Sequence, residues 1–310
     1  MNLSEMRQIL ARGDIRLTKS LGQNFMHDGN QLRRMLRAAE LAPGDRVLEI
    51  GPGLGALTEL LLAAGCEVLA IEKDRRLSEF LGTRFPDAGK LRLVHADALE
   101  LLRDMQEQPG PRGGAGEPAG PTGQRGLPDD WSDWKLVANL PYAVASPILV
   151  ELAQGRTCPG RMVVTLQEEV ALRLLARAGT AEYGVLTLLV GFQYVPGAWF
   201  RIPASCFFPA PDAGSACVTL TRRPTPLLDA DLARAFARIV KRGFSQRRKM
   251  MLKLLKTDWP AVEVEAAFNR LELSGRTRAE SVSLEQFAEL TRALARSGEG
   301  SGTGGTQRLT

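Results

Sequence analysis

The feature that most constrains the fold is a glycine-rich segment at residues 47–58, which reads VLEIGPGLGALT. A short apolar run leads directly into Gly51, Gly53 and Gly55, and a stretch with helical periodicity follows. Glycines permit a tight turn and a close approach of a ligand to the backbone, and the first turn of the helix offers free N–H groups. The segment therefore predicts a strand, a ligand-binding turn and a helix.

The following residues repeat this rhythm, which predicts βαβ units and a mainly parallel sheet in an α/β fold. We expect helices at residues 56–65 and 74–85, and strands at residues 46–50, 67–72, 91–97, 135–140, 161–167, 185–195 and 215–222. From about residue 227 the pattern becomes helical. At roughly 150 residues per domain, the 310-residue chain has room for two domains. We assign the first to residues 1–221 and a small helical one to residues 222–297.

Two segments fall outside this pattern. Residues 106–130 are dominated by Gly and Pro with almost no apolar side chains, and we expect a flexible insertion because such a stretch cannot offset its ordering entropy. Residues 298–310 predict a disordered tail. No apolar run approaches the roughly 18 residues of a membrane helix, and the N-terminus has no apolar signal core. We therefore expect a cytoplasmic protein without membrane contact.

Positive charge is concentrated in one part of the chain. The formal net charge is +5, and residues 222–256 contain eleven Lys or Arg. Residues 221–260 contain these eleven and three acids, so residues 221–260 carry 11 − 3 = +8 and the remainder 5 − 8 = −3. Such an excess indicates either a polyanion-binding surface or a solvated helix face. The candidate RNA-binding residues are Arg222, Arg223, Arg247, Arg248 and Lys249.

The sequence predicts no metal site. It has four cysteines, none in a C-x-x-C pair, and only two histidines. A zinc site needs more closely spaced ligands, and buried thiols in a reducing compartment are the simpler interpretation.

The ligand of the glycine turn is ambiguous from this motif alone. GPGLGA also satisfies the G-x-G-x-x-A pattern of dinucleotide-binding proteins, and Glu72, at the end of the second strand, suits the ribose of NAD or of S-adenosylmethionine. Glu49 gives the form E-x-G-x-G-x-G, which is usual in adenosylmethionine-dependent methyltransferases. Asp97, after the third strand, could accept the adenine amino hydrogens of the cofactor or cap a helix.

The tetrapeptide Asn139-Leu140-Pro141-Tyr142 follows the fourth strand and suggests chemistry at an adenine amine. That amine is a poor nucleophile because its lone pair is delocalised into the ring. The side-chain carbonyl of Asn139 and the backbone carbonyl of Leu140 could accept its hydrogens and localise the lone pair. Tyr142 offers a ring face on which a base can stack.

Taken in order, these motifs resemble the ribosomal RNA adenine N6,N6-dimethyltransferases, the KsgA/RsmA family. SLGQNFMHD at 20–28 resembles the family's G-Q-N-F-L motif, and SCFFPAPDAGSA at 205–216 resembles F-x-P-x-P-x-V-x-S. VKRGFSQRRKMMLKLLK at 240–256 and RAESVSLEQFAEL at 278–290 resemble its C-terminal helical segments. The resemblance implies a Rossmann-like, seven-stranded class I methyltransferase domain with a small C-terminal helical domain.

The resemblance also implies the site. It places the contacts with S-adenosyl-L-methionine at Asn24, Met26, Gly51, Gly53, Glu72, Asp97 and Asn139. The implied catalytic residues are Asn139, Leu140, Tyr142 and Phe207. Phe207 would stack on the target base. The implied substrate is two adjacent adenosines in the 3′-terminal hairpin loop of small-subunit rRNA, within an immature ribosomal subunit. We expect the enzyme to act as a monomer.

Three alternatives remain open. A large-subunit rRNA adenine methyltransferase of the antibiotic-resistance type shares the glycine and N-L-P-Y motifs. A non-catalytic RNA-binding assembly or transcription factor could use the same fold, although a pure binder has no need of the Asn139 acceptor. An NAD-dependent dehydrogenase is the least favoured, because no hydride-transfer His or Lys is evident near a second motif.

Overall fold

The computed structural model describes residues 1, 3–11, 15, 23–86, 88–107, 127–128, 130–155 and 158–295. The predicted insertion at 106–130 lies largely outside these residues, and the predicted tail at 298–310 lies wholly outside them. The strands are β1 (Phe25–Met26), β2 (Arg46–Ile50), β3 (Glu67–Glu72), β4 (Leu91–His95), β5 (Trp134–Asn139), β6 (Arg161–Gln167), β7 (Tyr194–Ile202), β8 (Phe207–Phe208) and β9 (Ser215–Arg222).

In the described part of the chain, the helices include three short 3₁₀ turns. The α-helices are α1 (Leu3–Ala11), α2 (Gly29–Ala39), α3 (Ala56–Ala63), α4 (Arg75–Arg84), α5 (Ala98–Glu107), α6 (Tyr142–Gln154), α7 (Glu168–Leu175), α8 (Val185–Gly191), α9 (Ala233–Gly243), α10 (Met251–Leu255), α11 (Ala261–Arg270) and α12 (Leu284–Ala295). The 3₁₀ turns are η2 (Ala204–Cys206), η3 (Ala230–Leu232) and η4 (Ala279–Ser281).

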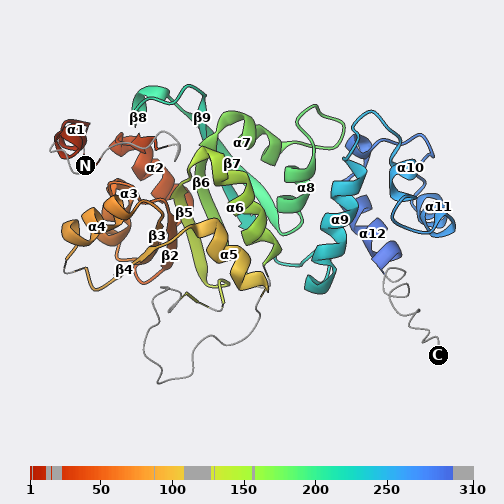
Figure 1. The fold of residues 1–310 in the computed structure, drawn as a ribbon, viewed down its shortest axis with the longest axis horizontal. Helices are drawn as coiled ribbons and strands as arrows, with labels where there is room; N and C mark the ends of the chain where they lie inside the picture. The colour runs from red at the N-terminus through yellow and green to blue at the C-terminus, as the bar shows by residue number, and fades with distance from the viewer. Residues whose placement is uncertain are drawn as a thin grey trace, which may run out of the picture. The chain divides into compact units, whose positions relative to one another are not determined.

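Seven strands form one sheet in the order β4-β3-β2-β5-β6-β9-β7 (Figure 1). Strands β2 to β6 pair in parallel, whereas β9 is antiparallel to both β6 and β7. The strand order changes direction between β2 and β5. In open α/β sheets, ligands bind outside the carboxyl ends of the strands at such a switch point.

A second, two-stranded sheet joins distant parts of the chain. β1 pairs with β8 in antiparallel fashion, with Phe25 opposite Phe208 and Met26 opposite Phe207. This pairing fixes the segment that immediately precedes α2.

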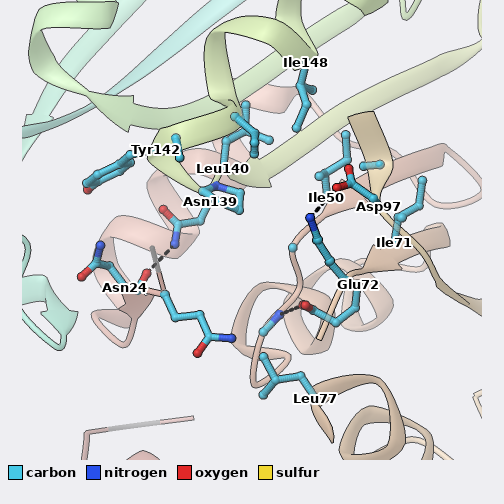
Figure 2. A pocket seen from close by; sticks show the side chains of 18 of the residues that line it. Asn24, Ile50, Ile71, Glu72, Leu77, Asp97, Asn139, Leu140, Tyr142 and Ile148 are labelled. Atoms are coloured by element: carbon cyan, nitrogen blue, oxygen red, sulfur yellow. Dashed lines mark hydrogen bonds and ion pairs between the residues drawn. The ribbon is translucent and has the colours of Figure 1, made fainter. Parts of the chain in front are cut away.

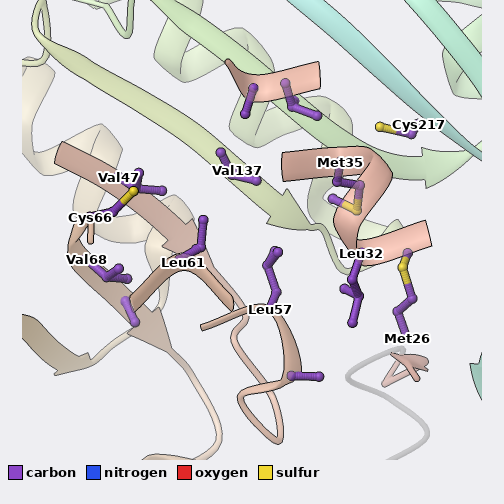
Figure 3. Packing of buried hydrophobic residues seen from close by; sticks show 14 of the residues in the cluster. Met26, Leu32, Met35, Val47, Leu57, Leu61, Cys66, Val68, Val137 and Cys217 are labelled. Atoms are coloured by element: carbon purple, nitrogen blue, oxygen red, sulfur yellow. The ribbon is translucent and has the colours of Figure 1, made fainter. Parts of the chain in front are cut away.

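The core beside the sheet explains why α2 forms where it does (Figure 3). Leu32, Met35 and Ala39 recur at helical spacing and are buried against strand residues such as Val137. Asp28 caps the helix, because its side chain accepts hydrogen bonds from the N–H groups of the second and third residues that follow it, at 2.8 and 2.9 Å. The opposite face of α2 is polar.

The strand predicted at residues 185–195 is wrong for most of its length. Residues 185–191 form α8, and only from Tyr194 does the chain enter β7. The segment is an almost uninterrupted apolar run, and such a run does not distinguish a buried helix from a buried strand. In the structure Leu188, Leu189 and Val190 are all buried, which accounts for the absence of a polar face.

The described residues divide into two compact units. The first contains residues up to Leu172 together with Tyr194–Arg222, and the second contains Arg173–Gln193 with the residues from Arg223 onward. The domain boundaries expected from sequence differ from this division at residues 173–193, which were assigned to the first domain, and at Arg222, which was assigned to the second. α8 belongs with the helical unit because its apolar residues pack there, and Phe192 stacks on Phe236 with ring centroids 5.2 Å apart.

The turn before α3 generates a stability prediction. Gly55 has φ of 78°, and a Cβ atom there would lie 2.8 Å from Leu81 and from Phe85. Gly55→Ala adds left-handed strain to overpacking, so we expect the free energy of unfolding to fall by about 2–4 kcal/mol in urea titrations. Gly82→Ala is the matched control. Gly82 lies within α4 with open space around it, and this change should raise stability by about 0.5–1 kcal/mol. Equal effects of the two changes would contradict the role assigned to the turn.

Candidate active site

A pocket lies at the carboxyl ends of β2, β3 and β5, with the turn after β4 beside them (Figure 2). Eight of the residues predicted from sequence line it: Asn24, Gly51, Gly53, Glu72, Asp97, Asn139, Leu140 and Tyr142. They come from four separate strand ends and from the residue before β1. The switch point of the sheet therefore brings together residues that are up to 118 positions apart, from Asn24 to Tyr142.

The glycine turn forms one wall of the pocket. Gly51 and Gly53 have φ of 68° and 60°, in the region that favours glycine. A Cβ atom at Gly53 would lie 2.6 Å from the ring of Phe25. The turn thus needs glycine both for its backbone conformation and for the close approach of β1.

Glu72 lies at the end of β3 and is only 6% exposed. Its Oε2 accepts the N–H of Gly53 at 3.1 Å, and its Oε1 accepts the N–H of Asp74 at 2.9 Å. Burial raises the pKa of the Glu72 carboxyl, while these backbone hydrogen bonds oppose the rise. Each carboxylate oxygen keeps a further lone pair, so Glu72 is oriented and still able to accept hydroxyl hydrogens.

Asp97 caps α5, which is one of the two roles left open for it, and it also lines the pocket. Its Oδ1 accepts the N–H of Leu99 at 2.8 Å at the start of α5, and its Oδ2 lies 2.6 Å from Nζ of Lys73. Burial raises the pKa of Asp97, but the Lys73 and backbone hydrogen bonds outweigh it and the net direction is downward. The carboxylate is therefore ionised, fixed and at the pocket wall.

Asn139 has the most informative hydrogen bonding in the pocket. Its Nδ2 donates to the backbone carbonyl of Asn24 at 2.9 Å, which fixes which way the amide faces. Its Oδ1 is buried and has no hydrogen-bond partner among the described residues. A buried acceptor without a partner costs free energy, and this one belongs to a residue that lines the pocket.

Tyr142 begins α6 directly after Pro141 and lines the pocket beside Asn139. Its hydroxyl lies 2.5 Å from Oγ of Ser215, and burial raises its pKa. This hydrogen bond anchors the far end of the side chain in β9 and so limits the rotation of the ring.

These residues fit S-adenosylmethionine. An anchored carboxylate suits ribose hydroxyls, a fixed acceptor beside apolar Ile71 suits an adenine, and the glycine turn brings backbone to the wall of the pocket. Glu72, Asp97 and the glycine turn would hold it. Among the described residues no group of three or more His, Cys, Asp or Glu is placed to hold a metal ion.

Two residues expected at the site lie elsewhere in the structure. Met26 and Phe207 face each other across the β1–β8 pair, and each is 3% exposed within the hydrophobic cluster that contains Leu32 (Figure 3). Neither lines the pocket. In this arrangement the Phe207 ring is covered by neighbouring side chains, so stacking on a target base requires it to leave the cluster.

Sequence reasoning missed several pocket residues. The side chains of Phe25, Ile50, Ile71, Leu77 and Ile148 form its apolar surface. Asn24 and Met26 were assigned to the cofactor, and alternation places Phe25 on the opposite face of the strand, so the pattern gave no signal for Phe25. The others come from strand ends and helices whose apolar residues look like ordinary core.

Arg222 and Arg223, predicted to bind RNA, have structural partners. Arg222 Nη1 donates to the backbone carbonyl of Cys158 at 2.6 Å, and Arg223 Nε donates to that of Gly191 at 2.9 Å. Both guanidinium groups are only partly exposed, and these bonds tie them to neighbouring segments of their own units.

The basic loop after α9 presents a mixture of engaged and exposed cations. Arg247 donates to Glu280 Oε2 at 3.3 Å and to the carbonyl of Ala181 at 2.7 Å. Arg248 and Lys249 are exposed, and their side chains have no ion pair or hydrogen bond among the residues that the structure describes. The five predicted RNA contacts are therefore not equivalent.

The sheet order, the glycine turn and the anchored acceptors define a Rossmann-like, S-adenosylmethionine-dependent methyltransferase. The family model described as "Ribosomal RNA adenine dimethylase" matches residues 15–296, and the chain belongs to that family. The class and fold predicted from sequence are thereby confirmed.

Named relatives agree with this assignment. The chain is similar to ribosomal RNA small subunit methyltransferase A of Moorella thermoacetica, with 37% identity over 89% of this chain and 92% of that protein. The corresponding protein of Pelotomaculum thermopropionicum is 38% identical, with coverage of 92% and 94%.

Solved structures share the fold. A dimethyladenosine transferase from Plasmodium falciparum superposes with a TM-score of 0.66 at 22% identity, covering 86% of this chain and 95% of that one. The 23S rRNA methyltransferase ErmE superposes with a TM-score of 0.59 at 26% identity, covering 88% and 100%. Among the described residues, no helix is long and apolar enough to cross a membrane.

A buried carboxyl beneath the glycine turn predicts a pH dependence of stability. Glu49 on β2 is 1% exposed and accepts the Thr58 hydroxyl at 2.7 Å. Burial, together with the charge of Glu72, raises its pKa from about 4.5 to about 8. The folded state therefore keeps Glu49 neutral over a range in which the unfolded chain ionises it, so stability should be lost as pH rises from about 4.5 to about 8.

Glu49→Gln keeps the acceptor and removes the titration. We expect urea titrations at several pH values to show the wild type losing free energy of unfolding relative to this variant between pH 5 and 8, and levelling off above that. Parallel profiles for the two proteins would mean that Glu49 is ionised in the folded state.

Proposed function

We propose that this chain transfers methyl groups from S-adenosylmethionine to N6 of two adjacent adenosines in the 3′-terminal hairpin loop of small-subunit rRNA, giving N6,N6-dimethyladenosine. The observation that carries the proposal is the buried, unpartnered Oδ1 of Asn139 at the pocket. An adenine amine is a donor of the kind that this acceptor lacks. The naming of the relatives as small-subunit enzymes supports the choice of RNA.

One set of pocket residues contacts S-adenosylmethionine, and another contacts the target base. S-adenosylmethionine, when bound, supplies an electrophilic methyl group on a sulfonium. Glu72 and Asp97 hold and orient its polar groups, and the apolar side chains Ile50, Ile71 and Leu77 exclude water from it. Alignment of two bound reactants supplies up to roughly 7–11 kcal/mol of the barrier without any covalent enzyme intermediate.

Asn139, Leu140 and Tyr142 act on the target base. The Asn139 carbonyl and the Leu140 backbone carbonyl accept the amine hydrogens, which localises the nitrogen lone pair and directs it away from the ring plane. The ring of Tyr142, anchored through Ser215, stacks on the base. Because the amine hydrogens become more acidic as the nitrogen becomes tetrahedral, these hydrogen bonds are strongest in the transition state.

The proton released after each transfer goes to solvent. The titratable side chains that line the pocket are Glu72, Lys73, Asp97 and Tyr142, and each already has a hydrogen-bond or ion-pair partner. None is positioned as an unengaged base. Phe207 is proposed as a stacking partner that leaves the β1–β8 cluster when RNA binds.

The cellular setting is a further part of the proposal. We assign the enzyme to the cytoplasm, acting as a monomer on an immature small subunit in which the hairpin loop is still accessible. Loop bases can be splayed out and stacked on aromatic side chains more readily than helical bases, which suits a pocket lined by Tyr142.

The second candidate is a large-subunit adenine methyltransferase, favoured by the similarity to ErmE. One experiment separates the two. Small subunits and large subunits from a strain that lacks both modifications are incubated with methyl-labelled S-adenosylmethionine and the purified chain. We expect N6,N6-dimethyladenosine in the 3′-terminal hairpin of the small subunit, whereas label confined to large subunits would favour the second candidate.

Removal of the Asn139 acceptor should impair catalysis more than binding. We expect Asn139→Ala to lower kcat on small subunits by about 100-fold, the loss typical of a group that acts in the transition state, with little change in RNA affinity. The S-adenosylmethionine affinity is measured in parallel by calorimetry, because the Asn24 contact is also lost. Tyr142→Phe is the comparison variant, and it should retain most activity since the ring face is kept. A wild-type rate of dimethylation in Asn139→Ala would refute the mechanism.

Exposed and engaged cations should respond differently to substitution. Arg248→Gln with Lys249→Gln should weaken RNA binding and reduce the log–log salt slope by about 1.4–1.8, at about 0.7–0.9 per phosphate contact, with stability unchanged. Arg247→Gln should instead lower the free energy of unfolding by about 1 kcal/mol, because it removes the bonds to Glu280 and Ala181. An unchanged salt slope in the double variant would identify these charges as a solvated surface.

A further inference from the structure

The register of the sheet places one residue of each of four strands in a single row. Asn139 of β5 lies opposite Thr165 of β6, Thr165 opposite Cys217 of β9, and Cys217 opposite Phe200 of β7. Residues directly opposite one another point to the same face of a sheet. With strands about 4.8 Å apart, Phe200 stands about 14 Å from Asn139, on the same face.

Helix α2 covers this row. The Thr165 hydroxyl contacts Met35 Sδ at 3.4 Å, and the guanidinium carbon of the neighbouring Arg34 lies 3.7 Å from the centroid of the Phe200 ring. Arg34 is exposed while Phe200 is half-buried. The guanidinium group is therefore held over an aromatic ring, and the side chain remains accessible to solvent.

The exposed side of α2 is a basic stripe. Asn30, Arg33, Arg34 and Arg37 follow helical spacing, all four are exposed, and α2 contains no acidic residue. Arg33 donates to Asn30 Oδ1 at 2.8 Å, and none of the three arginines has an ion pair within the part of the chain that the structure describes. Nearby acids are engaged elsewhere, since Glu40 pairs with Arg161 at 2.6 Å.

The stripe begins beside the pocket. Asn24 lines the pocket, β1 follows, and Asp28 caps α2 four residues later. The C-terminal end of β7 leads through η2 into β8, which pairs with β1. Thr165 and Cys217 of the row are buried beneath α2, so the surface that leads away from the pocket on this side of the sheet is the exposed stripe of α2, with Arg34 over Phe200 at the far end of the row.

We propose that Arg34 stacked on Phe200, with Arg33 and Arg37, forms a contact site for the single-stranded RNA that flanks the target adenosine. The inference rests on the proposed function and adds a second RNA contact, in the methyltransferase unit. The arginines bind phosphates, and the supported guanidinium plane of Arg34 carries an unpaired base on its free face. The charge of the stripe and the absence of acids on it match a polyanion.

The test measures binding to small subunits that lack the modification. In the variant, Arg34→Gln is combined with Arg37→Gln. The matched control removes the same charge at the amino ends of the strands, with Arg46→Gln and Lys90→Gln. We expect the first pair to raise the Kd on the order of tenfold and to lower the salt slope by about 1.4, with S-adenosylmethionine affinity unchanged, and the control pair to behave as wild type. Thermal unfolding verifies that each variant is folded.

Arg34→Lys separates charge from stacking. It keeps the phosphate contact but loses the flat group supported by Phe200, so the salt slope should be retained while the Kd rises. A Kd equal to the wild-type value in Arg34→Lys would overturn the stacking contact.

The remaining outcomes distinguish this inference from the proposed function. Wild-type Kd and slope in the double variant, while the wild-type enzyme methylates the subunits, would overturn the inference alone. Failure of the wild-type enzyme to methylate those subunits would instead overturn the proposed function. A loss of binding seen with intact subunits and not with deproteinised 3′-domain RNA would assign the stripe to a protein partner, and would also overturn the inference.

Discussion

The pairing of β2 with β3 on one side and β5 on the other is the constraint on which the site depends. It makes the strand order change direction at β2, so that the ends of β2, β3 and β5 and the turn after β4 meet at one edge. Every polar group assigned to the reaction is attached to that edge. The glycine turn after β2 contributes backbone groups to the pocket, Glu72 at the end of β3 contributes a carboxylate, and Asn139 at the end of β5 contributes a side-chain carbonyl. The pocket therefore exists only when these strand ends are brought together in the folded sheet.

The two buried acids near the glycine turn, Glu49 and Glu72, interact electrostatically. Glu49 and Glu72 lie close enough for their charges to interact, and burial raises the pKa of both. Two carboxylates in such surroundings do not both ionise readily. Glu72 has the backbone donors that favour its anion, whereas Glu49 has one hydroxyl. The arrangement favours a neutral Glu49 and a Glu72 carboxylate that can accept ligand hydroxyls, which explains why two acids so near each other serve different purposes.

Local signals in the sequence were sufficient for much of the fold and pocket. The strand-turn-helix at residues 47–58, the acid at the end of β3 and Asn139 after β5 were found because each combines a hydrophobic run with an abrupt change of residue type. The misassignment of residues 185–191 has a physical origin, because burial on all sides is decided by neighbours distant in the chain. For the same reason the sequence did not indicate that the side chains of Phe207 and Met26 pack in a buried cluster, or that Arg222 and Arg223 donate to backbone carbonyls.

The pairing of β1 with β8 also bears on how the enzyme matures. The backbone carbonyl of Asn24 accepts the hydrogen bond that orients the amide of Asn139. Asn24 directly precedes β1, and β1 is held in place by its pairing with β8 at residues 207–208. During synthesis, chains emerge from the N-terminus, and contacts between distant residues form only after both partners are available. The glycine turn and β2 to β5 can assemble early, but the wall that carries Asn24 must wait for β8. A nascent chain therefore acquires a complete methyl-transfer pocket only after residue 208 has left the ribosome, and shorter folding intermediates have an incomplete catalytic pocket.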